Sequence, residues 1–163
     1  MRRLVQAAAG GLILLGAALS GAARANPSML RTFNLNHPEF ISSHPFATTH
    51  VVIQVSEASP AVWTLALNNV ENLLGSLGQN RIQIVVVAFG PGLRILLAGS
   101  PDAARIQAMS VEGVEFDACH NTMERMAKKL GHLPVLLPQA VIVPSGVLRI
   151  IQLETHGFTY IRP

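Results

Sequence analysis

Short runs of β-branched and aliphatic residues alternate along this chain with longer segments whose apolar residues recur every three or four positions. The runs are typical of β-strands, and the longer segments are typical of amphipathic helices. Residues 82–89 are apolar almost without interruption, as expected for a parallel strand that is covered on both faces. The pattern predicts five strands, over residues 50–56, 82–89, 114–119, 140–143 and 158–161.

The helices that the pattern predicts begin at residues suited to helix starts. Ser59 is a good N-cap and Pro60 a good first helical residue, and the apolar stripe that follows over 62–77 stops at Gly78. Comparable signals predict three further helices: from Ser100-Pro101 to about Ser110, from Asn121 as N-cap to Leu130, and from Val147 to about Thr155.

Strands that alternate with helices in this way predict an α/β fold. Right-handed crossovers then place helices on both faces, giving a three-layer α/β/α domain with a mostly parallel sheet of about five strands. This domain is expected over residues 49–163. The stretch before it, residues 26–48, contains three prolines and no clear periodicity, which predicts an irregular, extended arm lying on the domain.

The first 25 residues are typical of a cleavable signal peptide. Arg2 and Arg3 precede an uncharged stretch from Leu4 to Ala23, and Ala23-Arg24-Ala25 supplies the small residues that signal peptidase requires. A transmembrane anchor is the alternative, because a stretch of this length just spans a bilayer. The short apolar centre and the small residues that follow it favour cleavage, with export to the periplasm and no membrane anchor afterwards.

Cleavage changes the charge balance of the protein. The whole chain has 12 Lys and Arg against 9 Asp and Glu, but Arg2, Arg3 and Arg24 leave with the peptide. The mature chain is therefore balanced and has no run of basic residues. Such a chain has neither the electrostatic footprint of a nucleic-acid-binding protein nor a polybasic patch for anionic lipid.

Cys119 is the one cysteine in the sequence, so no disulfide forms within the chain. It ends a predicted strand, at the sheet edge where open α/β domains bind ligands. A helix is expected to begin just after it, and a helix N-terminus favours the reactive thiolate form. The adjacent His120 and Asn121 are candidate polar neighbours. The alternative is structural, because a single Cys at the end of an apolar strand commonly packs as a small hydrophobic residue.

The other strand ends at this edge supply candidate ligand-binding residues. These are Ser56, Gly90, Gly92 and Ser145. Gly90-Pro91-Gly92 suits either an anion-binding backbone cradle or a simple tight turn, and the turn is favoured because the glycine spacing of nucleotide-binding loops is absent. No His pair has helical ligand spacing, so no metal is expected, and no motif indicates a cofactor.

Several segments resemble the DsrE/DsrF-like family of sulfur-relay proteins, in its exported branch. The resemblance covers the chain from His50 onward and depends on the order and spacing of four segments: 67–74 (LNNVENLL), 87–92 (VAFGPG), 114–123 (VEFDACHNTM), and the ending 143–146 (VPSG) with 157–163 (GFTYIRP).

The resemblance implies a homo-oligomer such as a trimer or hexamer, in which Cys119 accepts a persulfide sulfur. Since the chain has no second thiol, onward transfer needs a partner protein or a small thiol. Two functions follow as hypotheses. One is a periplasmic sulfur carrier, active as a carrier or transferase rather than as a hydrolase or oxidoreductase. The other is a non-catalytic oligomeric module of the same fold that binds a small ligand or has a structural role.

Overall fold

The computed structural model describes residues 25–163. The predicted signal peptide lies, except for Ala25, outside the described residues and stays a prediction. Within the part of the chain that is described, no helix combines the length and the apolar character needed to cross a membrane.

Five parallel strands form one sheet in the order β4-β3-β2-β1-β5. Their bounds are β1 Thr49–Val55, β2 Ile82–Ala88, β3 Glu115–Cys119, β4 Ala140–Val143 and β5 Thr159–Ile161. All seven residues of β2 are buried, as expected for a central strand of a parallel sheet. The predicted α/β class and five-stranded parallel sheet are confirmed.

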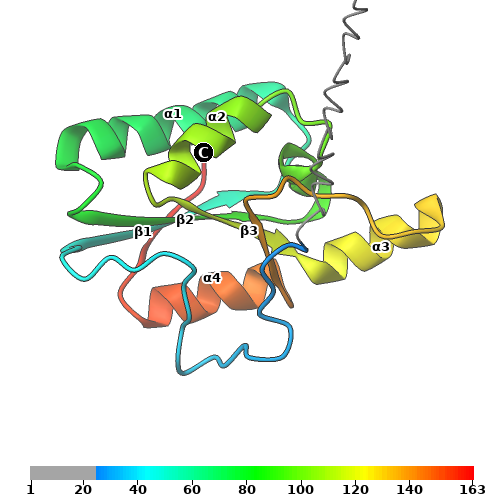
Figure 1. Ribbon diagram of the computed structural model, residues 1–163, viewed down its shortest axis with the longest axis horizontal. Helices are drawn as coiled ribbons and strands as arrows, with labels where there is room; N and C mark the ends of the chain where they lie inside the picture. The colour runs from blue at the N-terminus through cyan, green and yellow to red at the C-terminus, as the bar shows by residue number, and fades with distance from the viewer. Residues whose placement is uncertain (1–24) are drawn as a thin grey trace, which may run out of the picture.

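The helices cover both faces of this sheet (Figure 1). Helices α1 (Pro60–Leu77) and α2 (Ala103–Val111) lie on one face and α4 (Gly146–Thr155) lies on the other. Helix α3 (His120–Leu130) projects beyond the sheet edge, and its residues Met123 and Met126 join the α1 side. Right-handed crossovers explain this arrangement, because the chain steps in one direction from β1 to β4 and then returns to β5.

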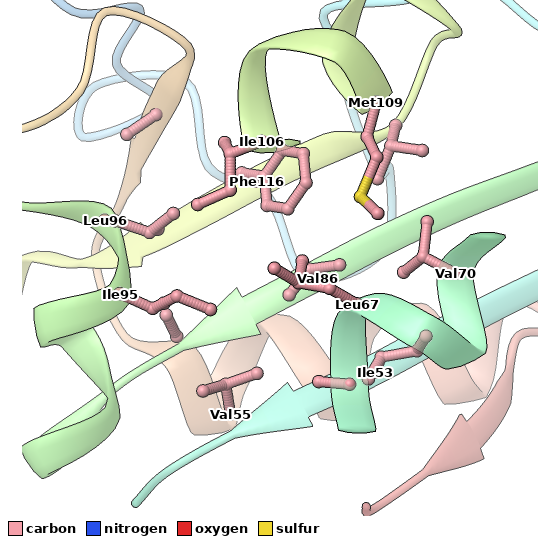
Figure 2. Close-up of a cluster of buried hydrophobic side chains, with 14 of the residues drawn as sticks. Ile53, Val55, Leu67, Val70, Val86, Ile95, Leu96, Ile106, Met109 and Phe116 are labelled. Atoms are coloured by element: carbon pink, nitrogen blue, oxygen red, sulfur yellow. The ribbon is translucent and has the colours of Figure 1, made fainter. Parts of the chain in front are cut away.

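Two apolar layers hold the helices to the sheet. The larger lies between the sheet and α1, α2 and the short 3₁₀ helix η1 (Gly90–Leu96), with Phe116, Leu67 and Ile106 fully buried near its centre (Figure 2). The smaller joins Val52, Val85 and Val87 to α4. Since opposite faces of β1 and β2 feed the two layers, both strands are apolar at nearly every position.

The arm of residues 26–48 runs across the α4 face and along the outer edge of β4 (Figure 1). Met29 N donates to Ile142 O and Ile142 N donates to Pro27 O, both at 2.8 Å. Phe40 stacks on Phe158, with ring centroids 5.7 Å apart. The arm therefore covers an otherwise open sheet edge.

Three local predictions need correction. Residues 90–96, expected as a turn and a short apolar segment, form η1. Helix α2 has Asp102 rather than Ser100 as its N-cap residue. Helix α3 begins at His120, directly after β3, so Cys119 rather than Asn121 occupies the N-cap position. By contrast, Ser59 caps α1 as expected, accepting from Val62 N.

Candidate functional site

The connections that follow β3 and β4 leave the sheet in different directions. After β3 the chain enters α3, which joins the α1 side, whereas after β4 it enters α4 on the opposite face. Neighbouring strands whose connections diverge leave a crevice at their carboxyl ends, and open α/β sheets bind ligands at such positions. Cys119 ends β3 and Val143 ends β4, side by side in register.

Cys119 faces the α4 side of the sheet. Alternate residues of a strand share a face, and Glu115 and Asp117, which precede Cys119 at this spacing, both bind Arg149 of α4. The register partner of Cys119, Val143, packs with Met29 and Phe33 of the arm. Cys119 is consequently buried, with 5% of its surface exposed.

Its sequence neighbours point elsewhere. The His120 ring lies along α3, with Nδ1 3.9 Å from the Glu124 carboxylate. The Asn121 side chain is exposed, and its backbone N–H donates to Pro144 O at 3.3 Å. This bond ties the β3–α3 junction to the β4–α4 loop. The structure therefore brings His120 and Asn121 to the same junction as Cys119, without a hydrogen bond from either side chain to its sulfur.

The predicted rim residues have individual structural roles. Ser145 caps α4 by accepting from Leu148 N. The Ser56 hydroxyl accepts from the Gln54 amide at 2.9 Å. Gly90 has a φ of +54°, a left-handed conformation that favours glycine, and its N–H donates to Thr122 Oγ1 at 2.9 Å. Gly92 packs so closely on the Val55 backbone that a Cβ there would collide with it.

A buried charged cluster on the α4 side was not predicted from the sequence. Arg149 is fully buried and binds Asp117 through Nε and Glu115 through Nη2, each at 2.8 Å. Arg149 Nη2 also donates to Glu39 O, and Glu115 accepts from Ile41 N, so the cluster fastens the arm to the sheet. The signal in the sequence was the alternation of two acidic residues within the apolar strand 114–119.

Burial raises the pKa of the Asp117 carboxyl well above its ordinary value, and the neighbouring Glu115 carboxylate raises it further, against the lowering effect of Arg149. Asp117 Oδ1 is buried without a hydrogen-bond partner among the described residues. One guanidinium facing two carboxyl groups thus favours retention of a proton on Asp117.

A cleft of about 510 Å³ opens on the opposite side of the same sheet edge, between η1, the loop that precedes α1, and α3. We call it the basic cleft. It is lined by Ala58, Gly90, Pro91, Arg94, Thr122, Arg125, Met126, Lys129 and Leu130. Of the predicted site residues, only Gly90 lines it. Elsewhere in residues 25–163, no three His, Cys, Asp or Glu side chains gather closely enough to hold a metal ion.

Comparison with known proteins finds a similar solved structure. No protein-family profile and no curated protein matches the chain. MTH1491 from Methanobacterium thermoautotrophicum, itself described as a protein of unknown function, shares 32% sequence identity and superposes with a TM-score of 0.63. The match covers 71% of this chain and 99% of MTH1491.

The chain belongs to the family of MTH1491. Because the match takes in nearly the whole of MTH1491, that protein corresponds to most of this chain, and the α/β fold is common to both. Membership assigns no activity, so the chemistry of the MTH1491 family has to be argued from the residues at this sheet edge.

Proposed function

We propose that this protein is an exported, DsrE-like sulfur carrier that holds sulfur as a persulfide on Cys119. The observation that carries the proposal is the place of Cys119, at the end of β3 where the connections of two neighbouring strands diverge. It is the only thiol in the sequence, and it occupies the N-cap position of α3.

The loading step is a thiol–disulfide-type exchange. The Cys119 thiolate attacks a terminal sulfur of inorganic polysulfide, forming an Sγ–S bond as the neighbouring S–S bond of the polysulfide breaks. The electron pair leaves with the shortened polysulfide, and the protein retains one sulfur as a persulfide. No net oxidant is needed, because the donor already carries the sulfur at the required oxidation level.

Burial restricts the donor and the acceptor. With 5% of Cys119 exposed, a small inorganic donor reaches the sulfur more readily than a folded protein does. The added sulfur lies about 2 Å beyond Sγ. Since the chain has no second thiol, handover then takes place to a small thiol or to a partner protein's cysteine.

The same burial favours the second candidate, a non-catalytic oligomeric module of this fold that binds a small ligand or has a structural role. In that case Cys119 serves as packing beside Val143. The two candidates differ in one measurable property, the reactivity of the thiol in the folded protein.

Intact-mass spectrometry of the native protein after exposure to polysulfide tests the carrier. We expect the mass of one sulfur atom to be gained, and to be lost again on addition of a small thiol. Cys119→Ala, which removes the sulfur without burying a new polar group, is the negative control. A wild-type protein that gains no sulfur and also resists mild alkylation while folded contradicts the carrier and supports the module.

We also propose that the protein is a homo-oligomer, a trimer or a hexamer. Supporting this, the loop between α3 and β4 leaves two apolar side chains well exposed, namely Leu133 and Val135. Apolar residues gathered in this way are typical of protein interfaces. Native mass spectrometry is expected to give three or six copies, and a monomer at micromolar concentration contradicts the proposal.

A further inference from the structure

We infer that the basic cleft is a binding site for a small molecule that carries a tetrahedral oxyanion group beside an apolar portion. The inference does not depend on sulfur chemistry at Cys119, which faces the other side of the sheet. It depends on which side chains line the cleft and on what those side chains contact.

Three cationic side chains converge on the cleft from two separate elements. Arg94 comes from η1, while Arg125 and Lys129 come from α3. Residues four positions apart share one face of a helix, so Arg125 and Lys129 present their charges together. All three side chains are exposed, and within residues 25–163 none of them makes an ion pair or a side-chain hydrogen bond.

No acidic residue lines the cleft. Two carboxylates adjoin it in sequence but do not line it. Glu57, next to Ala58, lies 3.5 Å from Arg162, and Glu124, next to Arg125, lies 3.9 Å from the His120 ring. Like charges brought together repel one another, and an anionic ligand relieves that repulsion.

The other residues that line the cleft indicate the chemistry of the ligand beyond its anionic group. Met126, Leu130 and Pro91 give the cleft an apolar part, while Thr122 supplies a hydroxyl. Its oxygen already accepts from Gly90 N, which leaves the O–H proton to donate to a ligand. Arg side chains donate in pairs to phosphate-like oxygens.

The size of the cleft matches this kind of ligand. A volume of about 510 Å³ is within the usual range for small-molecule sites, and such sites combine an apolar lining with a few polar groups that orient the ligand. A phosphate ester and a sulfur oxyanion share the required chemistry, and the experiment distinguishes these two sources.

Isothermal titration calorimetry with the full mature chain tests the site, using phenyl phosphate as the probe and phenol as its uncharged counterpart. We expect saturable binding of phenyl phosphate at one site per chain, weakened by added salt, and no saturable binding of phenol. Inorganic phosphate and thiosulfate then compete with the probe. The stronger competitor identifies the source of the oxyanion.

Two matched variants of α3 test whether phenyl phosphate binds in the basic cleft. Arg125→Gln is expected to weaken phenyl phosphate binding about tenfold or more, because it removes charge-assisted hydrogen bonds. Lys128→Gln removes a positive charge from the same helix at a residue that does not line the cleft, and it is expected to change affinity by less than about twofold.

Three results would overturn the inference: no saturable binding of any of the anions, equal weakening by the two variants, or binding of phenol as tight as that of phenyl phosphate. The salt titration on the unmodified protein keeps the test valid if a variant fails to fold. Tighter binding to anionic vesicles than to the small anions would also contradict the inference, since the cleft would then be part of a surface that binds membranes.

Discussion

Two groups of positive charge lie at one edge of this sheet, and they differ in what surrounds them. On the α4 side, Arg149 is buried and hydrogen-bonded through all three of its nitrogens. On the α1 side, Arg94, Arg125 and Lys129 are exposed around a cleft without acidic lining. A buried cation has to be paired because removing it from water is costly, whereas an exposed one stays hydrated until a ligand arrives. The first group therefore maintains the fold, and the second is available for binding.

The largest expected effect comes from removing the buried cation. Arg149→Met leaves Asp117 and Glu115 buried together without their counter-ion, which is expected to lower the free energy of unfolding by about 3–5 kcal/mol. Chemical denaturation measures this change. The control is Arg105→Met, which breaks an exposed pair with Glu71 and is expected to cost about 1 kcal/mol or less. Equal losses for the two variants would contradict the conclusion that the buried ion pairs of Arg149 maintain the fold more than an exposed pair does.

A substitution in η1, which forms one wall of the basic cleft, is expected to have the next largest effect on stability. A Cβ at Gly92 would collide with the Val55 backbone and force η1 away from β1, so Gly92→Ala is expected to destabilise the fold by about 1–3 kcal/mol. Gly75→Ala, in the last turn of α1 with nothing within 4 Å, is expected to stabilise it by about 0.5–1 kcal/mol. A neutral Gly92→Ala in thermal and urea unfolding would show that close packing of η1 does not fix the cleft.

The protonation of Asp117 gives a smaller effect that depends on pH. Because burial raises the pKa of the folded carboxyl, the folded state keeps a proton that the unfolded state has lost above about pH 4. The free energy of unfolding then falls as pH rises from the unfolded pKa to the folded pKa, by up to about 1.4 kcal/mol per unit.

Asp117→Asn, which cannot ionise, is expected to remove that part of the slope in urea denaturation carried out at a series of pH values. Glu71→Gln is the control. In the wild type, the hydrogen bond with Arg105 lowers the pKa of Glu71. The stabilising effect of this bond is therefore present above the ordinary Glu pKa and is lost only in acid. If the free energy of unfolding depends on pH in the same way for the wild type and Asp117→Asn between pH 4 and pH 7, the folded state does not retain a proton on Asp117.

The smallest effect is expected where the charges are available for binding. The double variant Arg94→Gln, Arg125→Gln removes two like charges that have no protein partner, so its free energy of unfolding is expected to stay within about 0.5 kcal/mol of the wild type. A loss of more than about 1 kcal/mol in the same measurement would mean that these side chains support the fold.

The alternation of apolar strands and amphipathic helices was enough to predict the α/β class, the five strands and the capped start of α1 at Ser59. These features depend on local periodicity and on residues adjacent in sequence. The start of α3 was predicted two residues late and with the wrong cap. Asn121 has the better capping side chain, but β3 continues straight into the helix and places Cys119 at that position.

Neither the buried cluster around Arg149 nor the basic cleft was predicted, because both depend on contacts between elements that are distant in sequence. Arg149 meets Asp117 and Glu115 across separations of 32 and 34 residues, and Arg94 meets Arg125 and Lys129 only because η1 and α3 line the same cleft. The sequence indicates which residues share one strand or one helix face, but pairing between distant elements depends on how those elements pack. The position of Cys119 was predictable because it needed only a strand end followed by a helix.

Peptide mapping of the folded protein after polysulfide treatment tests the central claim, sulfur loading at Cys119, most directly. We predict that the peptide containing Cys119 gains one sulfur atom in the wild type and equally in the double variant Arg94→Gln, Arg125→Gln, because the thiol faces the α4 side and the basic cleft lies on the other. A Cys119 peptide that remains unmodified in the folded wild-type protein would contradict it.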